Sequence, residues 1–235
     1  MIRIVVVADL HIHSVYSDGK ATPREIIRYA ADKGVHVISI TDHDTFKGGV
    51  EGYRLSRSLD SRSGLKILVV PGVELKSEAG DILVYCPNEV DLPRSIGPLI
   101  DKAHESNCII APAHPFDTLR NGIGELVYEY RGWDAIEVWN ARSSRKANSR
   151  AMDAALALGK PGLANSDAHI PEHIASAYTV LYIEEPSSVE DVLDAIRRGL
   201  VKPVAGTLSL GGWLKGLSWS IEYRMRKLYG SKQDL

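Results

Sequence analysis

The chain has 235 residues, of which 44% are hydrophobic and 25% charged, proportions typical of a globular protein with a large core. Its formal net charge is -2 and its pI is near 6.4, which argues against broad electrostatic binding of nucleic acid or of an acidic membrane. No apolar run approaches the roughly 20 residues needed to cross a bilayer, and charge appears too early for a signal peptide. We therefore expect a cytoplasmic protein without a membrane partner.

The two cysteines, Cys86 and Cys108, are too few for a disulfide framework and do not form a C-x-x-C motif. Both lie in apolar stretches of the sequence. The sequence therefore predicts two buried free thiols.

Short β-branched runs alternate with helical patterns along the chain. Ile4–Ala8 is a continuous apolar run, which is typical of a strand buried on both faces. Thr22-Pro23-Arg24-Glu25 combines a capping box with proline at the first helical position, and predicts a helix from Pro23 to about Lys33. Similar patterns predict strands at 35–40, 66–70, 81–86, 108–111, 135–139, 161–164, 177–183 and 201–204, and helices at 48–59, 95–105, 144–158 and 188–198.

This alternation predicts an α/β fold with a parallel sheet, either doubly wound or closed into a barrel. No G-x-G-x-x-G or P-loop motif follows the first strand, which disfavours a nucleotide-binding fold.

The last segment, residues 206–235, differs in character from the rest. Apolar residues recur there at helical spacing: Leu214, Leu217, Ile221, Met225 and Leu228. The pattern predicts an amphipathic helix that packs on the domain or on a sister subunit, rather than a membrane or cofactor element. A homo-oligomer formed through this helix is one of the two alternatives.

Histidines and acids collect where predicted strands end. The histidines are His11, His13, His43, His114 and His169, and the acids are Asp9, Asp18, Asp42, Asp44, Glu74 and Asp167. In a parallel α/β barrel these strand ends open on one rim, so the side chains would meet in one pocket. Imidazole and carboxylate without cysteine suit zinc, manganese or iron, and so many neighbouring acids would repel one another without cations. Together they predict a polynuclear metal site.

Each motif alone has a plainer interpretation. The His11-x-His13 pair could be polar residues where a strand meets a loop, and Asp42-His43 could be a turn. It is their occurrence at five strand ends that favours the metal site. His36, His104 and His173 fall at a strand start, inside a helix and in a first helical turn, so we interpret them as structural or solvated.

Seven short motifs, in this order along the chain, resemble the PHP (polymerase and histidinol phosphatase) superfamily, in particular its small stand-alone metal-dependent phosphoesterases. They are Asp9-Leu10-His11-Ile12-His13-Ser14, Ser17-Asp18-Gly19, Thr41-Asp42-His43-Asp44, Pro71-Gly72-Val73-Glu74, His114-Pro115, Glu137-Val138-Trp139-Asn140 and Ser166-Asp167-Ala168-His169. The resemblance implies a distorted (β/α)7 barrel over residues 1–205, followed by the C-terminal helical extension at 206–235. It also implies two or three divalent ions.

Carried over by position, the resemblance implies three sets of metal ligands. The first ion would be held by His11, His13, Glu74 and Asp167, the second by Glu74 and His114, and the third by Asp18, His43 and His169. Asn140 stands where some relatives place a histidine or cysteine ligand. Whether two or three ions bind, and whether they are Mn, Zn or Fe, stays open at this point.

The chemistry predicted for such a site is hydrolysis of a phosphate ester, with a metal-activated hydroxide attacking phosphorus in line. Asp167, His114 and Arg142 are the predicted catalytic residues. Arg142 is the first candidate to bind phosphate, and Arg145 the second, because both lie where a strand leads into a helix.

Further residues are predicted to support the site. Asp9 and Asp44 are candidates to orient the histidines. The segment 116–133, which contains Arg120, is a candidate specificity loop.

Two other functions compete with the phosphoesterase. One is metal-dependent hydrolysis of a C–N bond, as in amidohydrolase-like barrels, and the other is a non-catalytic binding domain. The expected substrate is a small phosphorylated molecule (a nucleotide or a sugar or amino-alcohol phosphate), including histidinol phosphate and short oligonucleotide ends. No stable complex with nucleic acid is expected.

Overall fold

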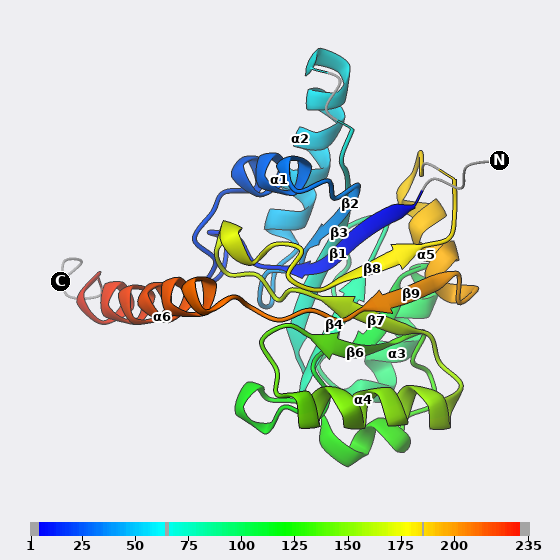
Figure 1. The fold of residues 1–235 in the computed structure, drawn as a ribbon. Helices are drawn as coiled ribbons and strands as arrows, with labels where there is room; N and C mark the ends of the chain where they lie inside the picture. The colour runs from blue at the N-terminus through cyan, green and yellow to red at the C-terminus, as the bar shows by residue number, and fades with distance from the viewer. Residues whose placement is uncertain (1–4, 64–65, 185, 231–235) are drawn as a thin grey trace.

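The computed structural model describes residues 5–63, 66–184 and 186–230; Ile4 of the first predicted strand and residues 231–235 of the extension lie outside them. Figure 1 shows the arrangement of the helices and strands. The strands are β1 (Val6–Ile12), β2 (Val37–Ile40), β3 (Leu68–Lys76), β4 (Asp81–Tyr85), β5 (Ile109–Pro112), β6 (Ile136–Asn140), β7 (Gly162–Asn165), β8 (Tyr178–Leu181) and β9 (Val201–Val204). The α-helices are α1 (Pro23–Asp32), α2 (Lys47–Ser63), α3 (Ile96–Glu105), α4 (Arg145–Leu158), α5 (Val189–Arg197) and α6 (Leu210–Gly230). Three short 3₁₀ helices are η1 (Thr118–Arg120), η2 (Gly124–Tyr128) and η3 (Pro171–His173).

The strands form two sheets, a seven-stranded one in the order β5-β4-β3-β2-β1-β8-β9 and the pair β6-β7. The predicted α/β class is confirmed, but parallel pairing is confined to β1-β2-β3 and β6-β7. The other pairs, β3-β4, β4-β5, β1-β8 and β8-β9, are antiparallel. Between β3 and β4 the connection spans only residues 77–80, which is too short for the crossover that a parallel pair requires.

Side-chain hydrogen bonds join the β6-β7 pair to the larger sheet. Thr179 of β8 donates to the Ala164 carbonyl and accepts from the Ala164 N–H, both at 2.9 Å. Asn165 at the end of β7 accepts from the Leu10 N–H of β1 at 3.0 Å. These contacts hold the β6-β7 pair against β1 and β8, so that the ends of β1 and β7 lie side by side.

The helices begin where the sequence predicts. At the start of α1, Thr22 and Glu25 form the predicted capping box, with Pro23 in the first turn. Helices α1 and α2 lie on one side of the strands, while α3 and α4 lie on the other (Figure 1). None of the helices in the described ranges has both the length and the apolar character to cross a membrane.

The prediction of two free thiols is wrong, because Cys86 and Cys108 form a disulfide. Both are buried, as expected. Antiparallel pairing of β4 with β5 places Tyr85 opposite Ile109, so the next residues outward, the two cysteines, face each other. This pairing depends on the sheet register, which the cysteine spacing does not show.

The C-terminal helix is confirmed as α6, but its predicted apolar stripe does not pack on the domain. Leu217 and Ile221 are 46% and 57% exposed. Another face is in contact instead, where the buried Trp219 donates from its indole N–H to the Asp18 carbonyl at 2.8 Å. Figure 1 shows α6 extending away from the body of the molecule. The division of the chain near residue 205 stays a prediction.

Candidate metal centre

The end of β1 carries the first two ligand candidates. His11 and His13 are two residues apart on an extended chain and point to the same side, with ring centroids 5.1 Å apart. The loop after β7 pairs with this strand end, since the His13 N–H donates to the Ala168 carbonyl at 2.8 Å. This pairing carries Asp167 to within 3.7 Å of His11 Nε2 and 3.4 Å of His13 Nε2.

The carboxylate of Glu74, on β3, lies between four imidazole rings. Its Oε2 is 3.3 Å from His11 Nε2 and 3.2 Å from His13 Nε2. The same oxygen is 3.1 Å from His43 Nδ1, while Oε1 is 2.9 Å from His114 Nε2. The sequence resemblance implies that Glu74 would be shared by two ions; these contacts are compatible with that role, which stays a prediction.

All eight predicted metal ligands fall into three overlapping groups. Their candidate ligand atoms lie within 4.8 Å of one another in each group, which are His13-Asp18-His43-His169, His11-Glu74-His114 and His11-His13-Asp167. The groups differ in part from the implied ligand sets: Glu74 falls with His11 and His114 but not with Asp167, and His13 joins the group of Asp18, His43 and His169. Asn140, by contrast, is in none of the groups, and its side chain donates to Glu137 and Asp167.

Several buried ring nitrogens of the site make no hydrogen bond, although carboxylate oxygens lie 3.2–3.7 Å from three of them, and this fits a cation. Within the described part of the chain, His11 Nε2, both ring nitrogens of His13 and His114 Nδ1 are buried without a hydrogen-bond partner. Buried polar atoms are rarely left without a partner, and coordination of a divalent ion would satisfy imidazole nitrogens of this kind.

The electrostatics of the site also favour cation binding. Burial by itself would raise the pKa of Asp167, but Arg142 and His11 hold that pKa well below its usual range. Burial likewise opposes the ionised form of Glu74, yet His11 and its other histidine neighbours keep its pKa well below normal. Both carboxylates are therefore ionised and available as ligands.

The histidines of the site differ in protonation. Burial and Arg142 lower the pKa of His169 to about 4, so its ring is neutral and able to bind a metal at neutral pH. Burial would also lower the pKa of His13, but Asp167 and Glu74 raise it to about 10. A proton on His13 thus occupies the position that a cation would take, and ion binding would release it.

A carboxylate to which no role was assigned from sequence, Glu137 on β6, supports this centre. It is buried, and its Oε1 lies 3.0 Å from His11 Nδ1 while accepting from Asn165 Nδ2 at 2.9 Å. Its Oε2 accepts from the His114 N–H at 2.7 Å and from Asn140 Nδ2 at 3.2 Å. Glu137 therefore orients His11 so that Nε2 points to the ions. An acid inside the apolar run Ile136–Trp139 is the sequence signal that could have revealed it.

Two other acids hold loops of the site. Asp42 accepts from the Ser14 N–H at 2.7 Å and from the Ser14 and Ser17 hydroxyls at 2.6 Å each, which shapes the loop that carries Asp18. Asp9 accepts from the N–H and hydroxyl of Ser166, next to Asp167. Asp9 thus supports the site through this loop and makes no hydrogen bond to a histidine within the described residues.

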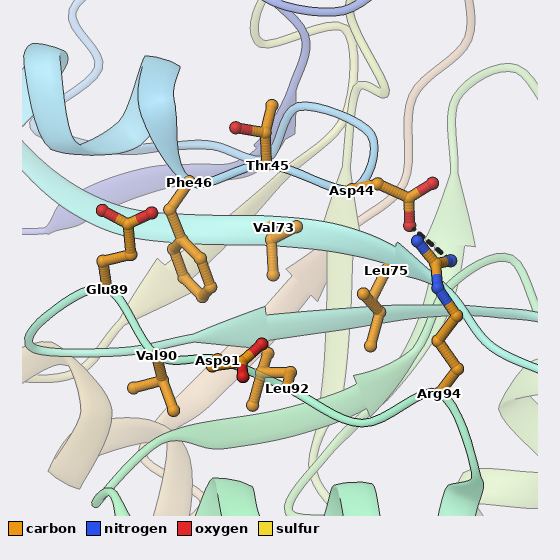
Figure 2. A pocket seen from close by; sticks show the side chains of 10 residues that line it. All are labelled: Asp44, Thr45, Phe46, Val73, Leu75, Glu89, Val90, Asp91, Leu92 and Arg94. Atoms are coloured by element: carbon orange, nitrogen blue, oxygen red, sulfur yellow. Dashed lines mark hydrogen bonds and ion pairs between the residues drawn. The ribbon is translucent and has the colours of Figure 1, made fainter.

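The prediction that Asp44 orients a histidine is wrong. Its carboxylate accepts from the Lys76 N–H at 3.0 Å and from Arg94 at 2.9 Å. Figure 2 shows this ion pair at one end of a pocket of about 480 Å³. Val73 and Leu75 line the pocket, and they flank Glu74 on β3. Because side chains alternate along a strand, the pocket lies on the opposite face of β3 from the metal ligands.

Two arginines lie beside Asp167 at the edge of the centre. Arg142, the predicted phosphate-binding residue, is 3.3 Å from Asp167 Oδ1 and donates to His169 Nδ1 at 2.6 Å. Arg120 reaches in from η1, donating to Asp167 Oδ2 and Asn140 Oδ1 at 3.2 Å each. Both side chains are about a quarter exposed, so they can face a substrate. Arg145 lies exposed at the first position of α4.

The remaining histidines lie outside the three ligand groups. His36 accepts from the Val7 N–H, His104 lies 3.3 Å from Asp134, and His173 contacts the Gly212 carbonyl of α6. Their structural interpretation agrees with these contacts.

Comparison with known proteins points to the same superfamily that the sequence motifs resemble. Residues 145–201 match a family model described as PHP-associated. An uncharacterized protein of Methanocaldococcus jannaschii is 32% identical over 147 residues, which is 57% of this chain and 81% of that protein. The 5'-3' exoribonuclease Rnm of Salmonella typhimurium is 35% identical over 99 residues, 42% of this chain but 29% of the exoribonuclease.

A solved structure from Bacteroides vulgatus, a two-domain protein containing a predicted PHP-like metal-dependent phosphoesterase, superimposes with a TM-score of 0.66. It is 20% identical, and the match covers 86% of this chain and 65% of that one, so it shows the fold. The chain belongs to the PHP superfamily.

Membership of the PHP superfamily confirms the predicted enzyme class, a metal-dependent phosphoester hydrolase, at the level of the family. Together with the three histidine and acid groups it supports the binding of divalent ions. The assignment of single residues to single ions stays a prediction.

Proposed function

We propose that this PHP protein hydrolyses phosphate esters of a small phosphorylated metabolite or nucleotide, using two or three divalent ions. The observation that carries the proposal is the position of Glu74, whose two carboxylate oxygens lie within 3.3 Å of nitrogens from His11, His13, His43 and His114. A carboxylate that lies among four imidazole rings is placed to act as a ligand together with several of them, as a site for neighbouring ions requires. Bound there, such ions would activate water and neutralise charge on the phosphate.

The residues of the chain supply the rest of the chemistry. Arg142 and Arg120 present their guanidinium groups beside Asp167, where they would bind phosphate oxygens that the ions leave free. His114 is buried and lies 2.9 Å from Glu74, so we assign it to ion binding rather than to proton transfer with substrate. Asp167 would hold an ion while keeping the two arginines in place.

The similarity to exoribonuclease Rnm supports nucleotides and short oligonucleotide ends as test substrates. The match spans less than a third of that enzyme, so its activity as a whole serves only as a guide. The net charge of -2 disfavours a tight complex with long nucleic acid.

The test is a hydrolysis screen with added Mn²⁺ across sugar phosphates, amino-alcohol phosphates, nucleotides, short oligonucleotides and a matched panel of amides. We expect release of phosphate or nucleotide, and expect His11→Ala and Asp167→Asn to reduce the rate by more than the roughly 100-fold that supporting residues usually cost. His104→Ala, outside the ligand groups, is the control and should retain activity.

Metal content and folding complete the experiment. The wild-type protein should carry two or more equivalents of divalent metal by elemental analysis, and both site variants should still melt cooperatively. Turnover of amides alone would favour the amidohydrolase alternative. Full activity in His11→Ala would refute the assigned site.

A further inference from the structure

Helix α6 presents a continuous apolar stripe to solvent. Six residues form this stripe, each between 45% and 76% exposed: Leu210, Leu214, Leu217, Ile221, Met225 and Leu228. Trp213 lies beside its start and is 52% exposed. Exposed apolar patches of this extent usually mark an interaction surface.

The opposite face of α6 is the one attached to the domain. Trp219 is buried and bonds the Asp18 carbonyl, while Lys215 pairs with Glu172 at 2.9 Å. Gly216 lies so close to His173 that an added Cβ would be 2.5 Å from the ring. These contacts set the rotation of α6 about its axis, so that the stripe points away from the described part of the chain.

The spacing of the stripe suits a straight partner helix. Leu210 and Ile221, Leu214 and Met225, and Leu217 and Leu228 are pairs separated by eleven residues. An eleven-residue repeat corresponds to 3.67 residues per turn, close to the 3.6 of a straight helix, so the stripe drifts by only about 20° around α6 in each repeat.

The stripe is also self-complementary when it is reversed. About Trp219 as centre, Leu210 is the counterpart of Leu228, and Leu217 that of Ile221. Trp213 is the counterpart of Met225 in the same alignment, and Leu214 is that of Arg224. A two-fold axis produces this arrangement, in which each residue meets its counterpart on the second copy. We propose that the α6 stripes of two copies of this chain pack antiparallel to form a homodimer.

The charges of α6 favour the antiparallel alignment over the parallel one. Arg224, Arg226 and Lys227 lie in its last two turns, whereas residues 210–214 carry no charge. Antiparallel packing places the basic end of each helix beside the uncharged start of the other. Parallel packing would place like charges together, which is destabilising.

The exposed area is sufficient for such a dimer. Taken with ordinary residue areas, the exposed fractions of the stripe and Trp213 correspond to roughly 700 Å² per protomer, so an interface that covered most of it would reach the lower part of the standard size range. An anionic membrane is the other kind of surface that a partly basic helix could meet. The match of the stripe with its own reversed copy is a feature that a membrane does not need, and this favours a second copy of the chain.

The first experiment measures the mass of the full chain by sedimentation over about 1–100 μM. We expect a dimer for the wild-type protein and a monomer for Leu217→Glu, because the new charge would be buried against Ile221 of the second copy. Glu222→Lys is the control, since it changes the charge of an exposed position about 100° around the helix from the stripe, and it should remain dimeric. Circular dichroism checks that both variants fold. We expect them to fold because both positions are exposed.

The second experiment tests the alignment. A mixture of Leu210→Cys and Leu228→Cys proteins should form a disulfide-linked heterodimer on oxidation, whereas either protein alone should not. Self-linking of Leu210→Cys alone would overturn the antiparallel alignment. A wild-type monomer throughout the range, a Leu217→Glu dimer, or binding of monomers to vesicles of anionic lipid would overturn the proposal.

Discussion

Glu137 offers the sharpest test of how this site is built, because it holds His11 and the His114 backbone without being a predicted ligand. The change Glu137→Gln keeps the size of the side chain and replaces one acceptor oxygen by an NH₂ donor. All four groups that face the carboxylate, His11 Nδ1, Asn165 Nδ2, the His114 N–H and Asn140 Nδ2, lie within 3.2 Å of it.

The magnitude follows from these contacts. Whichever way the new amide turns, its NH₂ faces groups that donated to the carboxylate, so at least one buried donor loses its acceptor. Each buried donor left unsatisfied costs about 1–3 kcal/mol, so the free energy of unfolding should fall by at least about 1–3 kcal/mol. Loss of a carboxylate behind a metal-binding histidine should also weaken ion affinity by roughly 10–100-fold, or about 1.4–2.7 kcal/mol.

The assay combines Mn²⁺ titration of chelator-treated protein, the rate of phosphoester hydrolysis and thermal unfolding. The matched control is Asp134→Asn, because Asp134 also accepts from a backbone N–H, that of Ile110, but lies outside the three ligand groups. The control should lose stability while its ion affinity stays normal. Wild-type ion affinity and rate in Glu137→Gln would refute the role assigned to this residue.

Three other predictions follow from contacts around the site. Arg142→Lys should raise KM for a phosphate ester by about tenfold, since one forked charge-assisted contact is lost, and steady-state kinetics showing an unchanged KM would contradict phosphate binding by this residue. Trp219→Phe removes the indole hydrogen bond to the Asp18 carbonyl, so a Mn²⁺ titration should show one class of ion, that at the group containing Asp18, bound a few-fold more weakly. Equal weakening of all ions would contradict this local role. The Cys86–Cys108 disulfide closes a loop with a sequence separation of 22, so its reduction should lower the free energy of unfolding by about 3 kcal/mol. Denaturant titrations with and without dithiothreitol measure this difference. Two reactive thiols in the unreduced, denatured protein would disprove the bond.

Much of this protein could be predicted from local patterns in its sequence. The capping box at Thr22 and Glu25 defines the start of α1 through groups three residues apart, so no tertiary contact is needed to recognise it. The candidate ligands were recognisable because histidines and acids recur at the ends of successive strands, and such ends converge on one rim. Which ions they bind, and how many, stays a prediction.

Features that join distant parts of the chain were decided by the tertiary structure alone. Cys86 meets Cys108 because β4 and β5 pair antiparallel in one register, and Glu137 meets His11 across 126 residues once the sheet has curled. Periodicity predicted the stripe of α6, but Trp219 and its bond to Asp18 determine which face of that helix touches the domain. A sequence pattern encodes spacing along one element, whereas hydrogen-bond partners on different elements are selected only when those elements pack.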